Sequence, residues 1–393
     1  MDAPIQAQSR SSCSSFPTVY GDEFKISVQN KFNDAQITTP EYSRSATKHV
    51  LLVAEEAIIP FTELHARGIL ESMHEYAPMC GGDRGARYVS CAILSCDSEE
   101  HLVALASDWF KLLLWPFKKA YMGQRPPASS DPAPTFEQGG PASFEAELYR
   151  RQGGTCAVLR LVDDRYWKKE NEIDTGLITA AHILRRSILT CDDPDDARKT
   201  DMWVSTLDIL KNFADIPDET IKSFDTMVDD PRNGMLLEAS MHDRFNHFAW
   251  CLVETDARGM FSVKWLTGRP YGIYKAYKRD TAVFTAHSPT PRTDASTPTP
   301  TPTSVVPPNP DPLFLRIHGA IAHILCATGA ADYIDKIFDR FDPKGNAVLS
   351  NGAGFLDLRL SLIDAGCSSH QLPPEPRGWG TQSQRPRPLS PNI

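Results

Sequence analysis

The sequence has 393 residues, with 41 Lys and Arg against 50 Asp and Glu, which gives a formal net charge of −9 at pH 7. This length accommodates two or three domains, and the acidic balance excludes a protein that coats nucleic acid by charge alone. No apolar run predicts a membrane span, and no apolar stretch behind a basic start predicts a secretory signal. The nine cysteines are scattered without CxxC spacing, so we expect reduced thiols in an intracellular protein, nuclear or cytoplasmic.

The first part of the chain is a polar stretch followed by a helical module. Residues 1–42 are rich in Ser, Gln and Thr and are predicted to be mobile. From 43 to 122 the spacing of apolar residues is helical, and the acidic group at 97–100 marks the start of the most apolar helix, which continues to residue 117. Because its apolar stripe is wide, we interpret this helix as part of a bundle core rather than as a partner-binding surface.

Proline marks the places where the modules are joined. Of the 31 prolines, 20 lie in the windows 123–142, 288–312 and 371–393. We therefore expect a linker at 123–143, a Pro/Thr-rich spacer at 288–312 and a disordered tail at 371–393. Two more helices are predicted between the spacer and the tail, in residues 313–370.

Residues 144–287 combine strand patterns with short helices and form the central domain of a predicted α+β chain. Apolar runs predict strands at 156–162, 176–181, 235–237, 248–254 and 260–266. The last two alternate as a β-hairpin around the turn Asp-Ala-Arg-Gly at 256–259. A helix is expected from about residue 240, directly after the short third strand.

Three polar residues stand at the ends of these elements. His182 follows a predicted strand, Asn233 stands in a turn before the next short strand, and His242 lies on the helix after it. A neutral histidine at a strand end takes a proton from water, a turn asparagine fixes a loop by hydrogen bonds, and a helix histidine holds a divalent ion against a phosphate. Either histidine alone would be read as structural, but the combination is typical of a ββα-metal nuclease site.

These motifs resemble those of the fungal HNH nuclease domain proteins, members of the ββα-metal or His-Me finger superfamily. The resemblance is carried by Ala-Ala-His-Ile at 180–183, by Asn-Gly-Met-Leu-Leu at 233–237 with the His and Phe that follow, and by Phe-Ala-Trp-Cys-Leu-Val-Glu at 248–254. It implies an HNH domain over 144–287. It further implies that His182 is the general base, and that Asn233 braces the loop and orients the imidazole of His182. His242 is implied to bind one divalent ion, Mg²⁺ or Mn²⁺ in preference to Zn²⁺.

The sequence departs from the family pattern at the metal site. Many HNH sites carry an acid just before the first histidine, where this chain has Ala181. Asn246 shares the helix face of His242 and is the candidate second metal ligand or phosphate contact, at a position that is Asp in many relatives outside the fungal group. Such a site suits Mg²⁺, which binds to few protein ligands and completes its coordination with water and phosphate. The groups considered for completing its coordination are Asp229, Asp230, Asp243 and substrate phosphate.

Four arginines flank the motif residues and are the candidate nucleic-acid contacts: Arg185, Arg186, Arg232 and Arg244. The leading prediction is a metal-dependent endonuclease that hydrolyses phosphodiester bonds of nucleic acid, with DNA favoured and no membrane association. The alternative is a catalytically inactive module that uses the HNH scaffold to bind nucleic acid or a protein partner. Ala181 and the acidic balance of the chain favour this alternative.

Overall fold

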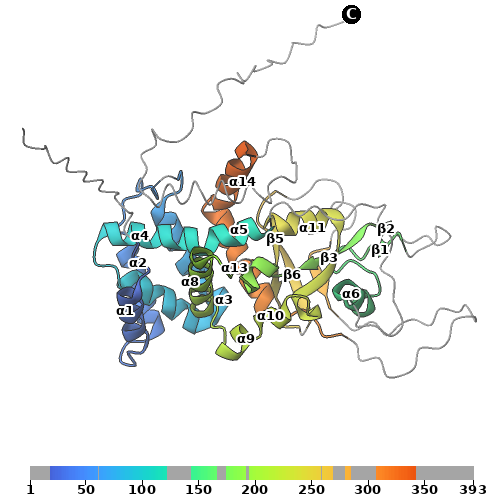
Figure 1. Ribbon diagram of the computed structural model, residues 1–393, viewed down its shortest axis with the longest axis horizontal. Helices are drawn as coiled ribbons and strands as arrows, with labels where there is room; N and C mark the ends of the chain where they lie inside the picture. Colours follow the sequence, from blue (N-terminus) through green and yellow to red (C-terminus); the bar gives the residue numbers. More distant parts are fainter. Residues whose placement is uncertain are drawn as a thin grey trace, which may run out of the picture. The chain divides into compact units, whose positions relative to one another are not determined.

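A computed structural model describes residues 18–60, 62–121, 143–165, 174–191, 194–257, 259–268, 279–284 and 307–341 (Figure 1). Helices and small sheets are mixed along the chain, which confirms the predicted α+β class. The predicted linker and spacer lie outside these ranges except at residue 143 and residues 307–312. The predicted tail lies wholly outside them.

The N-terminal helices begin earlier than the composition predicts. They are α1 (Asp22–Phe32), α2 (Thr39–Val50), α3 (Ala66–Leu94), α4 (Glu99–Trp109), the π-helix η1 (Phe110–Leu114) and α5 (Trp115–Tyr121). Residues 22–42, predicted to be mobile, thus contain α1 and the start of α2. The physical reason is a buried carboxylate in α4: Asp108 accepts hydrogen bonds from Thr18, Val19 and Tyr20 at 2.9–3.1 Å and fixes the chain just before α1.

The strongly apolar helix expected at 97–117 is confirmed as α4, η1 and α5 in succession. Ser98 caps its first turn, because its hydroxyl accepts the backbone N–H of His101. Leu102, Leu105 and Trp109 are fully buried. This burial confirms that the helix belongs to the core of the helical region.

Two helices follow the spacer, as the sequence predicts. They are α13 (Pro312–Ala327), which Asp311 caps, and α14 (Ala330–Phe341). Helix α13 packs against α3 on one side and against strand β5 (Trp250–Glu254) on another, so segments far apart in the sequence lie side by side (Figure 1). Within the described ranges no single helix is long and apolar enough to span a membrane, and α13 and α14 reach that criterion only as a pair bent by 82°.

The centre of the predicted domain at 144–287 is a pair of antiparallel strands followed by a helix. Strand β3 (Ile178–His182) pairs with β4 (Gly234–Glu238) in a register that runs from Ile178 opposite Glu238 to His182 opposite Gly234. Helix α11 (Ala239–Asn246) begins directly after β4 and packs on both strands. The residues between β3 and β4 form α7 (Arg186–Leu189), α8 (Ala197–Phe213), α9 (Asp218–Lys222), α10 (Phe224–Met227) and the 3₁₀ helix η2 (Pro231–Asn233).

Two further sheets and one helix surround this ββα unit. Strand β5 pairs with β6 (Met260–Trp265), which confirms the predicted hairpin, and β6 also pairs with β7 (Thr281–Val283). Helix α6 (Phe144–Gln152) packs on β3 and β4 from the other side (Figure 1). The short strands β1 (Val162–Asp163) and β2 (Thr175–Gly176) pair in parallel.

The strand predicted at 156–162 is wrong for most of its length. Cys156 instead opens a turn, in which its backbone N–H donates to the carbonyl of Leu161 and Arg160 adopts φ 63°. The buried sulfur of Cys156 accepts the backbone N–H groups of Leu159 and Glu238, both at 3.3 Å. These bonds hold the turn against the end of β4, so the apolar run is buried as a turn and β1 begins only at Val162.

Candidate active site

His182 lies at the end of β3, partly open to solvent and held on two sides. Its Nε2 is 3.0 Å from Oδ1 of Asp229, whose other carboxylate oxygen accepts Nη2 of Arg186 at 2.8 Å. The imidazole also stacks on the ring of Phe144 in α6, with centroids 4.1 Å apart and planes 8° apart. The side chain remains 24% exposed. This arrangement leaves an imidazole of fixed orientation within reach of a ligand.

Burial and charge keep His182 neutral. Burial lowers the pKa of His182 below its ordinary value, and the positive charge of Arg185 lowers it further. The hydrogen bond to Asp229 acts in the opposite direction and raises the same pKa. Because burial is the largest of these effects, His182 is unprotonated at neutral pH, which is the state that a general base requires.

The glycine of the motif makes room for the stacked ring. Gly234 lies opposite His182 in the strand pair, and a Cβ placed there would come within 2.2 Å of the Phe144 ring. A side chain at position 234 would therefore displace Phe144 from His182. Gly234 opens β4 with an extended backbone, directly after the 3₁₀ helix η2.

Asn233 is fully buried and ties two loops together. Its Oδ1 accepts the backbone N–H of Leu184 at 2.8 Å, and its Nδ2 donates to the carbonyls of Leu184 at 2.8 Å and Val228 at 2.9 Å. These bonds join the loop after His182 to the segment before β4. The side chain thus braces the loop, while the imidazole of His182 takes its direct contacts from Asp229 and Phe144.

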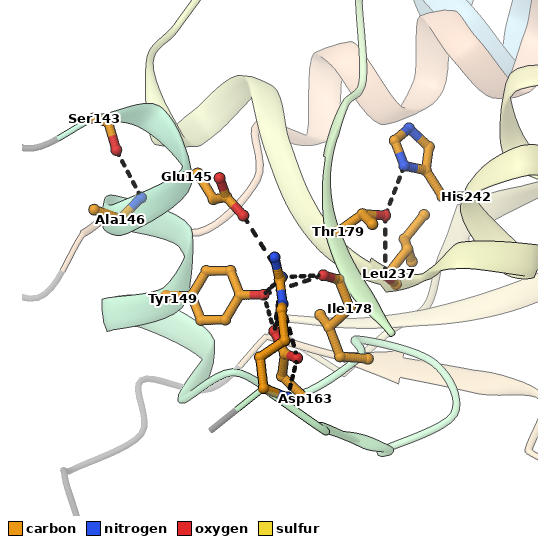
Figure 2. Close-up of polar contacts among 10 residues, drawn as sticks. Ser143, Glu145, Ala146, Tyr149, Asp163, Ile178, Thr179, Leu237 and His242 are labelled. Atoms are coloured by element: carbon orange, nitrogen blue, oxygen red, sulfur yellow. Dashed lines mark hydrogen bonds and ion pairs between the residues drawn. The ribbon is translucent and has the colours of Figure 1, made fainter. Parts of the chain in front are cut away.

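His242 lies beside Thr179 of β3 (Figure 2). It is therefore on the face of the strand opposite to His182, and it is only 5% exposed. Its Nδ1 is 2.8 Å from Oγ1 of Thr179, whose hydroxyl also lies 3.3 Å from the carbonyl oxygen of Leu237. Its Nε2 is buried and has no hydrogen-bond partner among the described residues. Burial lowers the pKa of His242 to about 3, and the positive charge of Arg185 acts in the same direction. The imidazole is therefore neutral across the ordinary pH range.

Arg185 and Asn246 form a pair beside His242. The amide oxygen of Asn246 accepts Nη2 of Arg185 at 2.8 Å. The guanidinium group is only 7% exposed and lies over the ring of Tyr121 in α5, 5.2 Å from the centroid. Tyr121 in turn donates its hydroxyl to the carbonyl of Ile183. The end of the N-terminal helical region thus contributes directly to the surroundings of the site.

The other three candidate nucleic-acid contacts are dispersed. Arg186 is 62% exposed and lies beside His182 through its pair with Asp229. Arg232 is also exposed, but its guanidinium binds both carboxylate oxygens of Asp230 at 2.8–2.9 Å. Arg244 lies half-buried on α11, where it lines a surface hollow with Asp243 and His247. Of the exposed arginines, Arg186 is the one that the structure places next to a predicted catalytic residue.

The whole ββα unit and the strand after it lie within one family match. Residues 156–253 match the HNH endonuclease family. The match spans His182, Asn233 and His242, and it supports an HNH nuclease domain at this position in the chain. No curated protein and no solved structure matches the chain.

The described residues around His242 offer few ligands for a metal ion. Among the residues that the structure describes, no group of three or more His, Cys, Asp or Glu side chains could hold a metal ion. Ala181 is fully buried on the face of β3 that Thr179 and His242 occupy, so a methyl group stands where many HNH sites have an acid. The neutral imidazole of His242, with its buried Nε2, fits one nitrogen ligand, and the remaining positions would be filled by water and phosphate.

The strand that ends at His182 is also held by residues that the motifs do not mark. A buried network supports the start of β3: Tyr149 and Arg165 donate to the carbonyl of Ile178 at 3.1 and 2.7 Å, and both bind the carboxylate of Asp163 (Figure 2). Sequence reasoning missed this network, and it considered Asp229 only as a metal ligand. Nothing in the sequence separates these residues from ordinary surface polar groups, because their partners lie far along the chain.

Proposed function

We propose that the HNH domain hydrolyses phosphodiester bonds of nucleic acid, with DNA favoured, in a metal-dependent endonuclease reaction. The observation that carries this proposal is the state of His182. Its imidazole is unprotonated at neutral pH, oriented by Asp229 and Phe144, and still 24% exposed at the end of β3. An oriented and accessible neutral imidazole is what the removal of a proton from water requires.

In the proposed reaction, His182 removes one proton from a water molecule. The oxygen of that water forms a new bond to phosphorus, while the bond from phosphorus to the leaving oxygen breaks. The leaving oxygen takes a proton from solvent, and His182 returns its proton to solvent afterwards. The guanidinium group of Arg186, which binds the same carboxylate as His182, would contact the phosphate.

A divalent ion, Mg²⁺ or Mn²⁺, would be held by His242 through Nε2, with Asn246 as a second ligand in place of its bond to Arg185. When bound, such an ion supplies positive charge that stabilises the negative charge developing on the phosphate. Thr179 accepts Nδ1–H of His242 when its own hydroxyl donates to Leu237, and Nε2 then carries the lone pair.

The test is the nicking of supercoiled plasmid DNA by the purified full chain, with Mg²⁺, Mn²⁺, Zn²⁺ or EDTA. We expect nicking with Mg²⁺ or Mn²⁺ and none with EDTA. His182→Ala should lower the rate by about 10²–10⁴-fold, the usual contribution of a positioned base, with an unchanged urea midpoint. His247→Ala is the matched control, because this exposed histidine is the C-cap residue of the helix that carries His242 and does not touch His182.

Two results would contradict the proposal at different levels. Nicking by His182→Ala at the wild-type rate would remove His182 from the role of base. Absence of nicking by the wild-type chain with every ion would contradict the hydrolytic function itself.

A further inference from the structure

We infer that Asp229 is a positioning residue for His182, which holds the imidazole as the Nε2–H tautomer and so makes Nδ1 the nitrogen that takes the proton from water. The inference rests on the proposed function, since it concerns the same imidazole. It adds to that function a residue 47 positions from His182 and a choice between the two ring nitrogens.

The tautomer follows from the kind of group that faces Nε2. An ionised carboxylate has no proton to donate and acts only as a hydrogen-bond acceptor. The 3.0 Å contact between Nε2 of His182 and Oδ1 of Asp229 is therefore a hydrogen bond only when Nε2 carries the proton. In a neutral imidazole the other nitrogen, Nδ1, then holds the lone pair. Among the described residues Nδ1 makes no hydrogen bond, which leaves its lone pair unused, and the side chain as a whole is 24% exposed.

Asp229 is itself held in place. Its second oxygen accepts Nη2 of Arg186 at 2.8 Å, so the two carboxylate oxygens are divided between one imidazole and one guanidinium group. The residue lies between α10 and η2, and Asn233 ties that segment to the loop after His182 through Val228. The carboxylate is thus fixed relative to His182 by its own ion pair and by the buried amide nearby.

The ring of His182 is restrained in two independent ways. Phe144 fixes the plane of the imidazole by stacking at 4.1 Å, and Asp229 fixes its rotation within that plane by the hydrogen bond to Nε2. Once Nδ1 has taken a proton, the same carboxylate faces a positively charged imidazolium and stabilises it. A structural ion pair between Asp229 and Arg186 alone would have neither effect on the histidine.

The direct test is a long-range ¹H–¹⁵N NMR spectrum of the full chain labelled at histidine, with His182 assigned by its loss in His182→Gln. The wild-type chain at pH 7.5 should show His182 with Nε2 protonated and Nδ1 unprotonated. In Asp229→Asn the amide offers either an oxygen or an N–H to Nε2, so the preference for one tautomer should fall. Asp225→Asn is the matched control, because this exposed aspartate lies on the neighbouring helix α10 and should leave the spectrum of His182 unchanged.

Kinetics distinguish positioning from the other roles that Asp229 could have. Asp229→Asn should lower kcat for plasmid nicking by about 10- to 100-fold, a part of what the base contributes. It should leave KM and the Mg²⁺ concentration for half-maximal rate unchanged. A raised KM would make Asp229 a substrate contact, and a raised Mg²⁺ requirement would make it a metal ligand, and either result overturns the inference.

The failure of this inference differs from failure of the proposed function. An Nδ1–H tautomer in the wild-type chain, or an unchanged tautomer in Asp229→Asn, overturns the role of Asp229 even when the wild-type chain nicks DNA. If the wild-type chain nicks no DNA, the proposed function fails, while the NMR spectrum still decides whether Asp229 sets the tautomer.

Discussion

His182 and His242 flank the same pair of strands, and their surroundings differ in every respect that matters for chemistry. His182 is partly exposed and faces a carboxylate, an exposed arginine and a stacked phenylalanine. His242 is enclosed and faces the neutral hydroxyl of Thr179 and the buried Arg185, on the face of β3 that also carries Ala181. Alternation along β3 creates the contrast, because successive side chains point to opposite faces.

The proposed function gives the two histidines different roles, and this difference in surroundings matches them. Both imidazoles are neutral, but only His182 has a carboxylate that would stabilise the imidazolium formed when it accepts a proton. The buried charge of Arg185 opposes protonation of His242, whose remaining use is to offer a lone pair from Nε2. Under the proposed function, the open side would serve proton transfer and the closed side would hold a ligand.

A third histidine packs against Phe245 of α11, the helix that carries His242. His318 of α13 stacks on Phe245 at 3.7 Å and on Phe248 at 4.9 Å, and its Nε2 lies 3.3 Å from the carbonyl oxygen of Phe245. Burial lowers the pKa of His318 to about 3. The closed side therefore depends on a helix that follows the spacer, whereas the open side depends on α6 and the segment before β4.

The largest expected effect comes from removing Asn233, whose hydrogen bonds join the loop after His182 to the segment before β4. Asn233→Ala deletes three hydrogen bonds to buried backbone groups and should lower the free energy of unfolding by about 3 kcal/mol, at about 1 kcal/mol for each bond. Urea unfolding measures this loss. Asn33→Ala, in an exposed position after α1, is the control and should change stability by less than about 0.5 kcal/mol. An equal effect of the two substitutions would show that Asn233 does not brace the site.

The second expected effect is the pH dependence of the free energy of unfolding that His318 causes. The folded chain holds His318 with a pKa of about 3, below the ordinary 6.5. The unfolded chain therefore binds the proton more readily, so the stability is fully present above pH 6.5 and is lost as the pH falls toward 3. At about 1.4 kcal/mol for each pH unit, one such histidine removes about 2 kcal/mol between pH 7 and pH 5.

His318→Phe should remove that contribution while keeping the aromatic stack on Phe245 and Phe248. Urea unfolding at pH 7 and at pH 5 should show a loss of stability about 2 kcal/mol smaller in the variant than in the wild-type chain. His247→Phe, at an exposed histidine, is the control and should leave the pH dependence as it is. The same pH dependence in wild-type and His318→Phe chains would mean that His318 is not buried in its neutral form.

The sequence predicts the parts of this site that local patterns determine. Apolar runs place β3 and β4, and the helix after them follows from its position, because these signals need no knowledge of distant segments. The spacing of His182, Asn233 and His242 then places each residue on its element. The family match spans the same three residues.

The parts that the sequence does not predict depend on contacts across long stretches of chain. Asp229 resembles any aspartate in an acidic turn until the fold sets it against His182. Arginine is usually a surface residue, yet Arg185 is buried and contacts Tyr121 and Asn246. The apolar run after Cys156 has the composition of a strand, but a cysteine sulfur that accepts two backbone N–H groups makes it a turn.

The smallest expected effect separates the orientation of His242 from its burial. Thr179→Val keeps the shape of the strand face but removes the hydroxyl that faces Nδ1, so both tautomers of His242 become available. Stability should fall by about 1 kcal/mol, the value of one buried hydrogen bond. The Mn²⁺ concentration for half-maximal nicking should rise by about 10-fold, as for other lost partners of a metal-binding histidine. Thr47→Val, at an exposed threonine of α2, should change neither quantity. A loss of stability without a change in Mn²⁺ requirement would show that the hydroxyl supports the fold alone, and that the enclosed side of β3 does not hold the ion.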